Sequence, residues 1–490
     1  MTESGYPRIG KVWKRGTPMG EATVAFEGSV EDVSAGTFFD DTPGYERHMA
    51  YRSLTFYTDE LYLQRDGEFV KLDVPDGAQK GLVREWLLLE LRQPWSVGGE
   101  DHPAGSLIAI RLDDLLAGER DFDVLFTPTP NSSLSSWGAT KNHFYINVLE
   151  DVKNRISVLT PGADGWAAEP LAGVPATGAI GISAVDADES DEYFMTVNDY
   201  LTPTSLLHGT IGGGAPTMLK QLPAYFDASP YAVSQHFATS RDGTKVPYFM
   251  VAPKDLELDG DNPTLLYGYG GFEVSMLPGY SGSVGRAWLS EGGVYVVANA
   301  RGGGEYGPRW HQAALKANRD RAYEDFAAVA QDLIARKVTR PARLGIQGGS
   351  NGGLMTGNMM VKYPELFGAV VSQVPLLDMY RYHKLLAGAS WMAEYGDPDK
   401  PEEWAFLQKN SPYHNVRADV DYPPVLFTTS TRDDRVHPGH ARKMTARMLE
   451  QGHDVLYYEN IEGGRGGAAN NEQAAFMQAL SWTFLKQKLF

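Results

Sequence analysis

The stretch RLGIQGGSNGGLM, residues 343–355, joins an apolar strand to a glycine-rich segment through Ser350. Residues 348–352 fit the pattern Gly-x-Ser-x-Gly. A sharp turn from a strand into a helix brings the two backbones close together, so the residues beside the serine must be small. Such a turn presents the hydroxyl at the carboxyl edge of a sheet, where the backbone amide of Asn351 can face an oxyanion. The stretch therefore predicts a nucleophilic serine on a strand–turn–helix unit, with a plain glycine-rich turn as the alternative.

The sequence on both sides of Ser350 alternates between apolar strands and helical patterns. Strands are expected at TLLYGY, GVYVVANA, ARLGIQ, GAVVSQV, PPVLFTTS and VLYYENI, after a hairpin that turns at Asp242-Gly243. Residues 323–334 are apolar at helical spacing, and similar helices follow Ser350, Pro438 and Asn470. This alternation predicts a mostly parallel, doubly wound sheet with helices on both faces, as in the α/β-hydrolase fold.

The first half of the chain reads instead as short strands separated by turns. Its apolar centres at Val24, Phe69, Ala109, Ser157 and Leu206 recur roughly every 40–50 residues, which is the period of four-stranded propeller blades. This period predicts four to five blades of a partial β-propeller, with a β-sandwich as the alternative. Because the pattern changes near a Gly/Pro-rich stretch, we expect a partial propeller domain over residues 1–220 and an α/β-hydrolase catalytic domain over residues 221–490.

Composition and charge narrow the classes of function. The 490 residues are 42% hydrophobic, and 62 acidic against 44 basic residues give a net charge of −18, which disfavours nucleic acids and anionic membranes as partners. The chain has no cysteine for disulfides or thiolate metal sites, and we expect neither a metal nor a cofactor. The first residues lack the apolar core of a signal peptide, so no targeting segment is expected, and cytoplasmic and periplasmic locations both stay open.

A nucleophilic serine needs an acid and a base, which follow it in the chain order serine, carboxylate, histidine. The strand in PPVLFTTSTRDDRVHPGHARKM ends at Asp433, the expected acid. The base should lie in the loop after the next strand, but the centre of that loop, IEGGRGGAAN, is Arg465. A guanidinium stays protonated and has no lone pair for a proton, so Arg465 can pair with Asp433 but not replace a base. The alternative is that His437 or His440, which lie beside the acid in the sequence, serves as the base.

A second oxyanion donor is expected where an earlier strand ends. The stretch LLYGYGGFEVS places Tyr269 at such a junction, where its phenol O–H can assist the amide of Asn351. An aromatic ring that only packs under a glycine turn is the alternative reading.

Several motifs of the second half stand together in the order and spacing of one known family. The stretches YGYGGF, NARGGGEYGPRWH, GGSNGGLM, KNSPYHNV and DDRVHPGHA make most of residues 235–490 resemble the prolyl oligopeptidase family of serine peptidases. The first half resembles the last part of that family's seven-bladed propeller, which covers the active site, so we expect the opening blades and the family's N-terminal helical segment to be missing. The resemblance implies a peptidase that needs no cofactor.

The resemblance also assigns roles to residues. It implies a nucleophile at Ser350, a triad acid at Asp433, oxyanion donors at Tyr269 and Asn351, a carbonyl-binding arginine at Arg435, and a proline pocket lined by Phe272 and Trp391. Two positions depart from the family pattern. By this resemblance, Phe406 takes the position at which strict proline-cleaving members stack a tryptophan on the proline of the substrate. Arg465 takes the position of the family's catalytic histidine.

These readings predict a serine peptidase that acts on short peptides, after proline or a small apolar residue, with impaired activity. Loss of one triad member typically lowers turnover on the order of 10⁴–10⁶-fold. A catalytically inactive peptide-binding protein and an esterase remain as alternatives. The sequence leaves the oligomeric state open.

Overall fold

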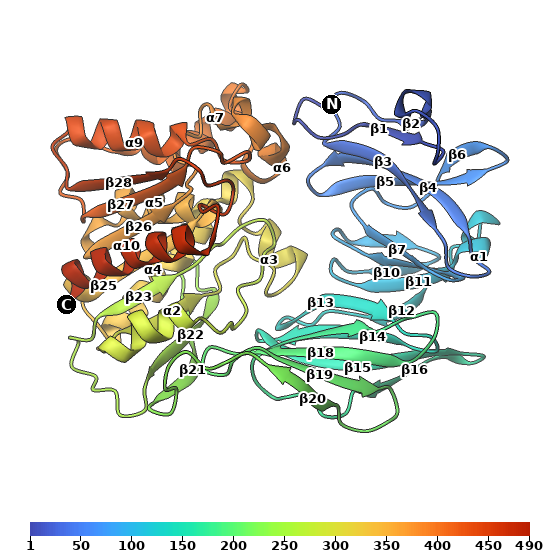
Figure 1. Ribbon diagram of the computed structural model, residues 1–490, viewed down its shortest axis with the longest axis horizontal. Helices are drawn as coiled ribbons and strands as arrows, with labels where there is room; N and C mark the ends of the chain where they lie inside the picture. The colour runs from blue at the N-terminus through green and yellow to red at the C-terminus, as the bar shows by residue number, and fades with distance from the viewer.

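The structure is a computed structural model that describes residues 1–490, in which two groups of sheets lie side by side (Figure 1). The C-terminal group is one eight-stranded sheet with helices around it, and the N-terminal group is a succession of small antiparallel sheets. The chain therefore combines a partial β-propeller with an α/β-hydrolase fold, as the sequence pattern predicts. No helix has both the length and the apolar character required to cross a bilayer.

The large sheet has the strand order β21-β22-β24-β23-β25-β26-β27-β28, and its strands from β24 onward in this order run parallel. The hairpin of β21 and β22 turns at the expected place, where Gly243 has a φ of 88°. Every residue of β27 is buried, as is typical of a strand covered on both faces. The bounds are β21 Tyr231–Thr239, β22 Lys245–Pro253, β23 Thr264–Tyr267, β24 Val294–Ala298, β25 Leu344–Gly349, β26 Ala369–Gln373, β27 Val425–Ser430 and β28 Val455–Asn460.

Helices cover both faces of this sheet because its strands alternate their side chains between two cores. Leu266 and Val370 pack with helices α4, α5 and α9, whereas their neighbours Leu265 and Val371 pack with α10 and Trp288. The helices that the sequence predicts after residue 320 and after Ser350, Pro438 and Asn470 are all present. The bounds are α1 Leu112–Leu116, α2 Gly282–Ala287, α3 Pro308–Gln312, α4 Asp320–Ala335, α5 Asn351–Lys362, α6 Met392–Tyr395, α7 Pro401–Leu407, α8 Pro412–Asn415, α9 Gly439–Glu450 and α10 Asn471–Leu489.

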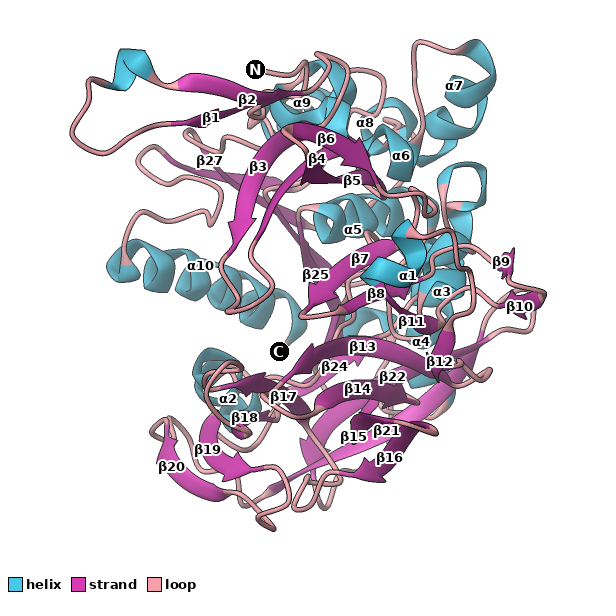
Figure 2. Ribbon diagram, turned by 90° about the vertical axis from the view of Figure 1, so that its right-hand side faces the viewer, coloured by secondary structure: helices cyan, strands magenta, loops and turns pink.

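Four four-stranded antiparallel sheets and two two-stranded ones form the N-terminal half. The four-stranded sheets start at Ser34, Gln79, Ser132 and Ala179, which confirms the propeller period and rules out the sandwich alternative. In Figure 2 they face the viewer and follow one another in front of the large sheet. Their strands are β3 Ser34–Asp40, β4 Arg47–Thr55, β5 Thr58–Arg65, β6 Glu68–Lys71, β7 Gln79–Val83, β8 Trp86–Glu90, β11 Leu107–Arg111, β12 Asp123–Phe126, β13 Ser132–Ala139, β14 Phe144–Glu150, β15 Lys153–Gly162, β16 Gly165–Pro170, β17 Ala179–Ala184, β18 Glu192–Asn198, β19 Ser205–Thr210 and β20 Thr217–Gln221. The two-stranded sheets pair β1 Ile9–Val12 with β2 Thr23–Glu27, and β9 Trp95–Val97 with β10 Glu100–His102.

The two halves meet along the loop that leads into α3, which faces the small sheets in Figure 1. The hydroxyl of Ser133 donates a buried hydrogen bond of 2.8 Å to the carbonyl oxygen of Glu305, and the hydroxyl of Tyr306 donates one of 2.7 Å to Asp151. Paired polar groups at such a contact fix the orientation of one half against the other.

Candidate active site

Ser350 lies on a strained turn between β25 and α5. Its φ of 59° and ψ of −115° are rare for a residue with a side chain, and α5 begins at the next residue. A Cβ on Gly348 would lie 2.4 Å from the carbonyl oxygen of Gly352, and one on Gly352 would lie 2.8 Å from that of Gly268. The glycines are therefore required by close backbone contacts, as the sequence predicts for a turn that exposes a serine.

The two expected oxyanion donors lie next to each other. Burial raises the pKa of Tyr269 above its ordinary value, although the charge of Arg465 and a hydrogen bond with Ser350 oppose this shift, so the phenol stays protonated as a donor. The side-chain amide of Asn351 donates a bond of 2.6 Å to the backbone carbonyl of Tyr269. Its own oxygen accepts bonds from Arg319, at 2.6 Å, and from the hydroxyl of Tyr395, at 2.7 Å. These bonds hold the backbones of both donors together.

Glu394 is the centre of a buried network that supports this arrangement. Its carboxylate accepts a bond of 2.6 Å from Arg319 and one of 3.1 Å from the backbone amide of Phe272, and it lies 2.7 Å from Nε2 of His311. The hydroxyl of Tyr57, from the propeller half, donates to the same carboxylate. Burial alone would raise the pKa of Glu394, but the bond from His311 and the charge of Arg319 outweigh it and lower that pKa to about 2.

The sequence patterns do not predict this network or its members from the propeller half. Tyr57 and Phe56 are the two residues of the turn between β4 and β5, and Arg92 reaches Nδ1 of His311 at 2.9 Å. A two-residue hairpin turn is usually built from glycine, asparagine or aspartate. Two adjacent aromatic residues at such a turn are the one signal in the sequence that could have marked a contact with another part of the molecule.

Asp433, the expected acid, has a fully buried side chain. Its Oδ1 accepts hydrogen bonds of 3.0 Å from the backbone amides of Arg435 and Val436, which fix the carboxylate. Its Oδ2 has no hydrogen-bond partner, although Nη1 of Arg465 lies 3.6 Å away. A buried carboxylate oxygen without a donor is costly, so this atom marks a place where a donor is missing.

Arg465 occupies the space between the serine and the carboxylate. Its Nη2 donates a hydrogen bond of 2.6 Å to Oγ of Ser350. No histidine forms a hydrogen bond with Ser350 or Asp433. Among the two nearby candidates, His437 accepts from the amide of Gly439, and His440 is buried.

The ring of His440 is hydrogen-bonded to the backbone and not to the serine. Its Nδ1 accepts bonds of 3.2 and 3.1 Å from the backbone amides of Leu377 and Asp378. Burial lowers the pKa of His440 to about 4, so the ring is neutral and held in its place by the backbone. Neither His440 nor His437 is positioned to serve as the base.

A cavity of about 250 Å³ opens beside Ser350. Its lining consists of Phe56, Tyr269, Phe272, Val274, Ser350, Leu376, Trp391, Tyr395, Arg435 and Arg465. The structure thus brings together nearly all the residues expected at the site, including Trp391. Phe272 packs edge-on against Tyr395, with ring centres 5.6 Å apart, and against Phe56 of the propeller half at 5.1 Å.

The structure does not bring Phe406 into this cavity, which corrects the expectation that it contacts substrate. Phe406 lies on α7 and lines a separate, small cavity with Arg319, Tyr323 and Leu354. Its ring packs under Gly396, where it belongs to the apolar cluster behind the pocket wall. The tryptophan available for stacking on a proline ring is Trp391, which lines the cavity beside Ser350.

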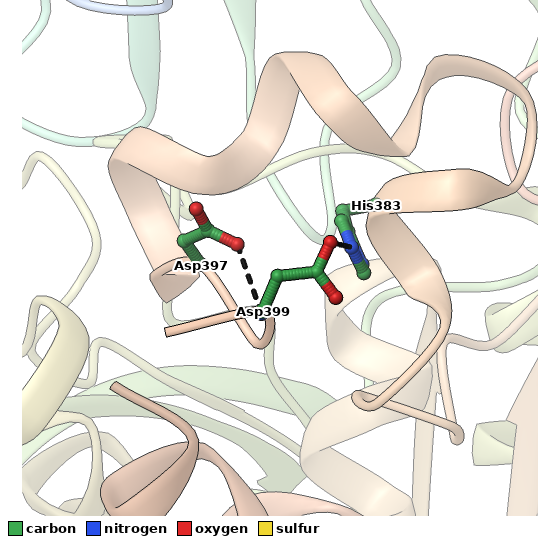
Figure 3. Close-up of side chains that lie close together, drawn as sticks. All are labelled: His383, Asp397 and Asp399. Carbon is green, nitrogen blue, oxygen red and sulfur yellow. Dashed lines mark hydrogen bonds and ion pairs between the residues drawn. The ribbon is translucent and has the colours of Figure 1, made fainter. Parts of the chain in front are cut away.

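One group of side chains elsewhere has the spacing of metal ligands, namely His383, Asp397 and Asp399 (Figure 3). Nε2 of His383 lies 3.0 Å from Asp399, whose other oxygen accepts from Lys384 at 3.0 Å. Lys400 lies 4.0 Å from Asp397. Lysines already compensate both carboxylates. The group is therefore better explained as an ion-pair network that stabilises a loop than as a cation site.

The fold and the site define a serine hydrolase whose catalytic half lies against a propeller. Residues 281–489 match the family model described as the prolyl oligopeptidase family. An uncharacterized peptidase of Sinorhizobium fredii is 45% identical over 503 residues, which cover all of this chain and 68% of that protein. The chain therefore belongs to the prolyl oligopeptidase family of serine peptidases.

Solved structures agree with this assignment. A post-proline cleaving enzyme from Rickettsia typhi superposes with a TM-score of 0.93 at 34% identity, covering all of this chain and 72% of that structure. Prolyl oligopeptidase B from Galerina marginata, bound to a 35-residue hydrolysis and macrocyclization substrate, superposes with a TM-score of 0.86 at 25% identity. The superposition covers 98% of this chain and 68% of that structure. The chain thus spans about two thirds to three quarters of these relatives.

Proposed function

We propose that this chain is a serine peptidase for short peptides, cut after proline, whose activity is impaired by Arg465. Ser350 attacks the peptide carbonyl, and the phenol of Tyr269 and the backbone amide of Asn351 stabilise the oxyanion. Asp433 is the acid that would orient a base. The proposal includes two domains, residues 1–220 and 221–490. In support of this boundary, the last four-stranded sheet ends with β20 at Gln221 and the eight-stranded sheet starts at Tyr231.

The pocket supports the substrate class. A proline side chain is a compact apolar ring, and the aromatic walls of Phe272, Trp391 and Tyr395 surround a space suited to it. Arg435, at the rim of the same cavity, is proposed to bind a carbonyl on the acyl side of the cut bond. The relatives solved as post-proline cleaving enzymes make the same specificity the natural proposal for this chain.

The observation that carries the impairment is the bond from Nη2 of Arg465 to Oγ of Ser350. When the oxygen of Ser350 attacks a carbonyl carbon, its proton must leave to an acceptor. Arg465 is a donor with no lone pair, so it occupies the serine oxygen and takes no proton. The leaving amine also lacks an imidazolium to protonate it, because no neutral imidazole has taken up the serine proton, so both halves of acyl transfer are slowed.

The test replaces Arg465 with histidine. The Arg465→His variant should gain roughly 10⁴-fold in kcat/KM on a fluorogenic peptide with proline before the cut bond, because it restores the missing acceptor and donor. Its Ser350 should also react faster with a fluorophosphonate probe. Arg432→His, at an exposed position close by in the sequence, should change neither rate and serves as the matched control.

The outcomes separate the candidate functions. The proposal fails if the parent chain labels Ser350 as fast as Arg465→His, because then a base is present after all. No gain in either assay on Arg465→His would favour the inactive peptide-binding protein, which the bond between Arg465 and Ser350 also suits. Turnover of activated esters without peptide cleavage in both forms would favour an esterase, because such esters demand less of the base.

A further inference from the structure

The cavity beside Ser350 has an unusual balance of charge. Two guanidinium groups, those of Arg435 and Arg465, line it, and no carboxylate does. Arg465 lies 3.6 Å from the buried Asp433, whereas Arg435 takes part in none of the salt bridges of the protein. The wall that faces a ligand therefore carries a net positive charge.

The remaining polar groups of the cavity are donors as well. The phenol of Tyr269 stays protonated, and Ser350 already accepts from Arg465. A neutral carbonyl oxygen can accept from some of these groups, but it leaves the charge uncompensated. A carboxylate offers two oxygens and a negative charge, and a guanidinium binds it through two parallel hydrogen bonds. The donor set thus matches a carboxylate better than the carbonyl of an uncut peptide bond.

Apolar walls continue from this donor cluster. Phe272, Trp391 and Tyr395 enclose the space next to Ser350, and the whole cavity measures about 250 Å³, enough for one ring-sized side chain and a terminal group. We propose that the cavity binds short peptides that end in proline with a free C-terminal carboxylate, placed between Arg465 and Arg435. This inference rests on the proposed function for the direction of the peptide, and it names a ligand of the product type rather than a substrate.

Binding of a matched pair of peptides tests the proposal. N-acetyl-Ala-Ala-Pro with a free carboxylate and the same peptide as its C-terminal amide are titrated into the intact chain by calorimetry. The acid should bind roughly tenfold or more tightly, because charge-assisted hydrogen bonds are stronger than neutral ones. A rise in NaCl from low to high concentration should weaken binding of the acid and leave the affinity for the amide unchanged.

Two variants locate the effect. Arg465→Gln removes one of the two facing charges and should reduce the preference for the acid while keeping the affinity for the amide. Arg432→Gln, at an exposed position outside the cavity lining, should keep the preference. Equal binding of acid and amide to the parent chain, or a preference that is undiminished in Arg465→Gln, overturns the proposal.

Two further results keep this test apart from that of the proposed function. Acetate alone should not displace the acid peptide at equal concentration, because it lacks the apolar contacts with Trp391, and if it does, the site is a plain anion site and the proposal is refuted. The absence of peptide cleavage by Arg465→His would overturn the peptidase but leave the acid preference of the parent chain standing. If the Arg465→His variant cleaves peptides but the parent chain binds acid and amide equally, the peptidase proposal stands and the carboxylate inference is overturned.

Discussion

Replacing Glu394 with glutamine should destabilise the catalytic half by about 3 kcal/mol at pH 7. The carboxylate is fully buried and receives Arg319, His311 and Tyr57 as donors. A glutamine of the same shape turns one acceptor oxygen into an NH₂ group that faces the N–H of His311 and the hydroxyl of Tyr57. It also leaves the buried charge of Arg319 without its partner, a change that costs about 3–5 kcal/mol in other proteins.

The pKa of Glu394 gives a second route to the magnitude. The pKa is lowered from 4.5 to about 2, and each unit corresponds to about 1.4 kcal/mol. Because the folded pKa lies below the unfolded one, this stabilisation is fully present above about pH 4.5 and is lost as the pH falls through 2. Both routes give a contribution of Glu394 to the free energy of unfolding of about 3 kcal/mol at pH 7. By the linkage relation, about half of this contribution or less remains at pH 3.

Urea unfolding of the parent and Glu394→Gln chains at pH 7 and pH 3, followed by tryptophan fluorescence, measures the effect. Glu365→Gln, an exposed position with no ion pair, is the control and should match the parent at both pH values. The reasoning is wrong if Glu394→Gln unfolds at the parent's urea concentration at pH 7. A loss of stability that is equal at both pH values would show that the carboxylate acts through packing and not through its charge.

Two further predictions concern the pocket and the oxyanion site. Tyr269→Phe should slow fluorophosphonate labelling of Ser350 on the order of 10²-fold, because one donor to the oxyanion is lost, and unchanged labelling would show that the phenol only packs. Trp391→Ala should weaken binding of a proline-ended peptide by about 1–3 kcal/mol, whereas Phe406→Ala should leave it within error because that ring lies outside the cavity. Calorimetric titration of both variants compares them directly, and the opposite ranking would place Phe406 in the pocket.

The sequence predicts much of this fold because the signals are local. The glycines around Ser350, the apolar strands and the helical spacing of residues 323–334 each follow from backbone geometry within a few residues, so they appear in the sequence as short periodic patterns. The position of Arg465 after β28 is local in the same way, which is why its closeness to Ser350 and Asp433 could be expected from the order of strands.

Only the tertiary structure decided which distant side chains complete the site. Tyr57 stands 337 residues before Glu394, yet it donates to that carboxylate across the contact between the two halves. The sequence also placed Phe406 at the substrate, and the fold instead turns it to the far side of the pocket wall. Contacts of this kind depend on how whole sheets and helices pack against each other, and side-chain spacing along one segment carries no information about that packing.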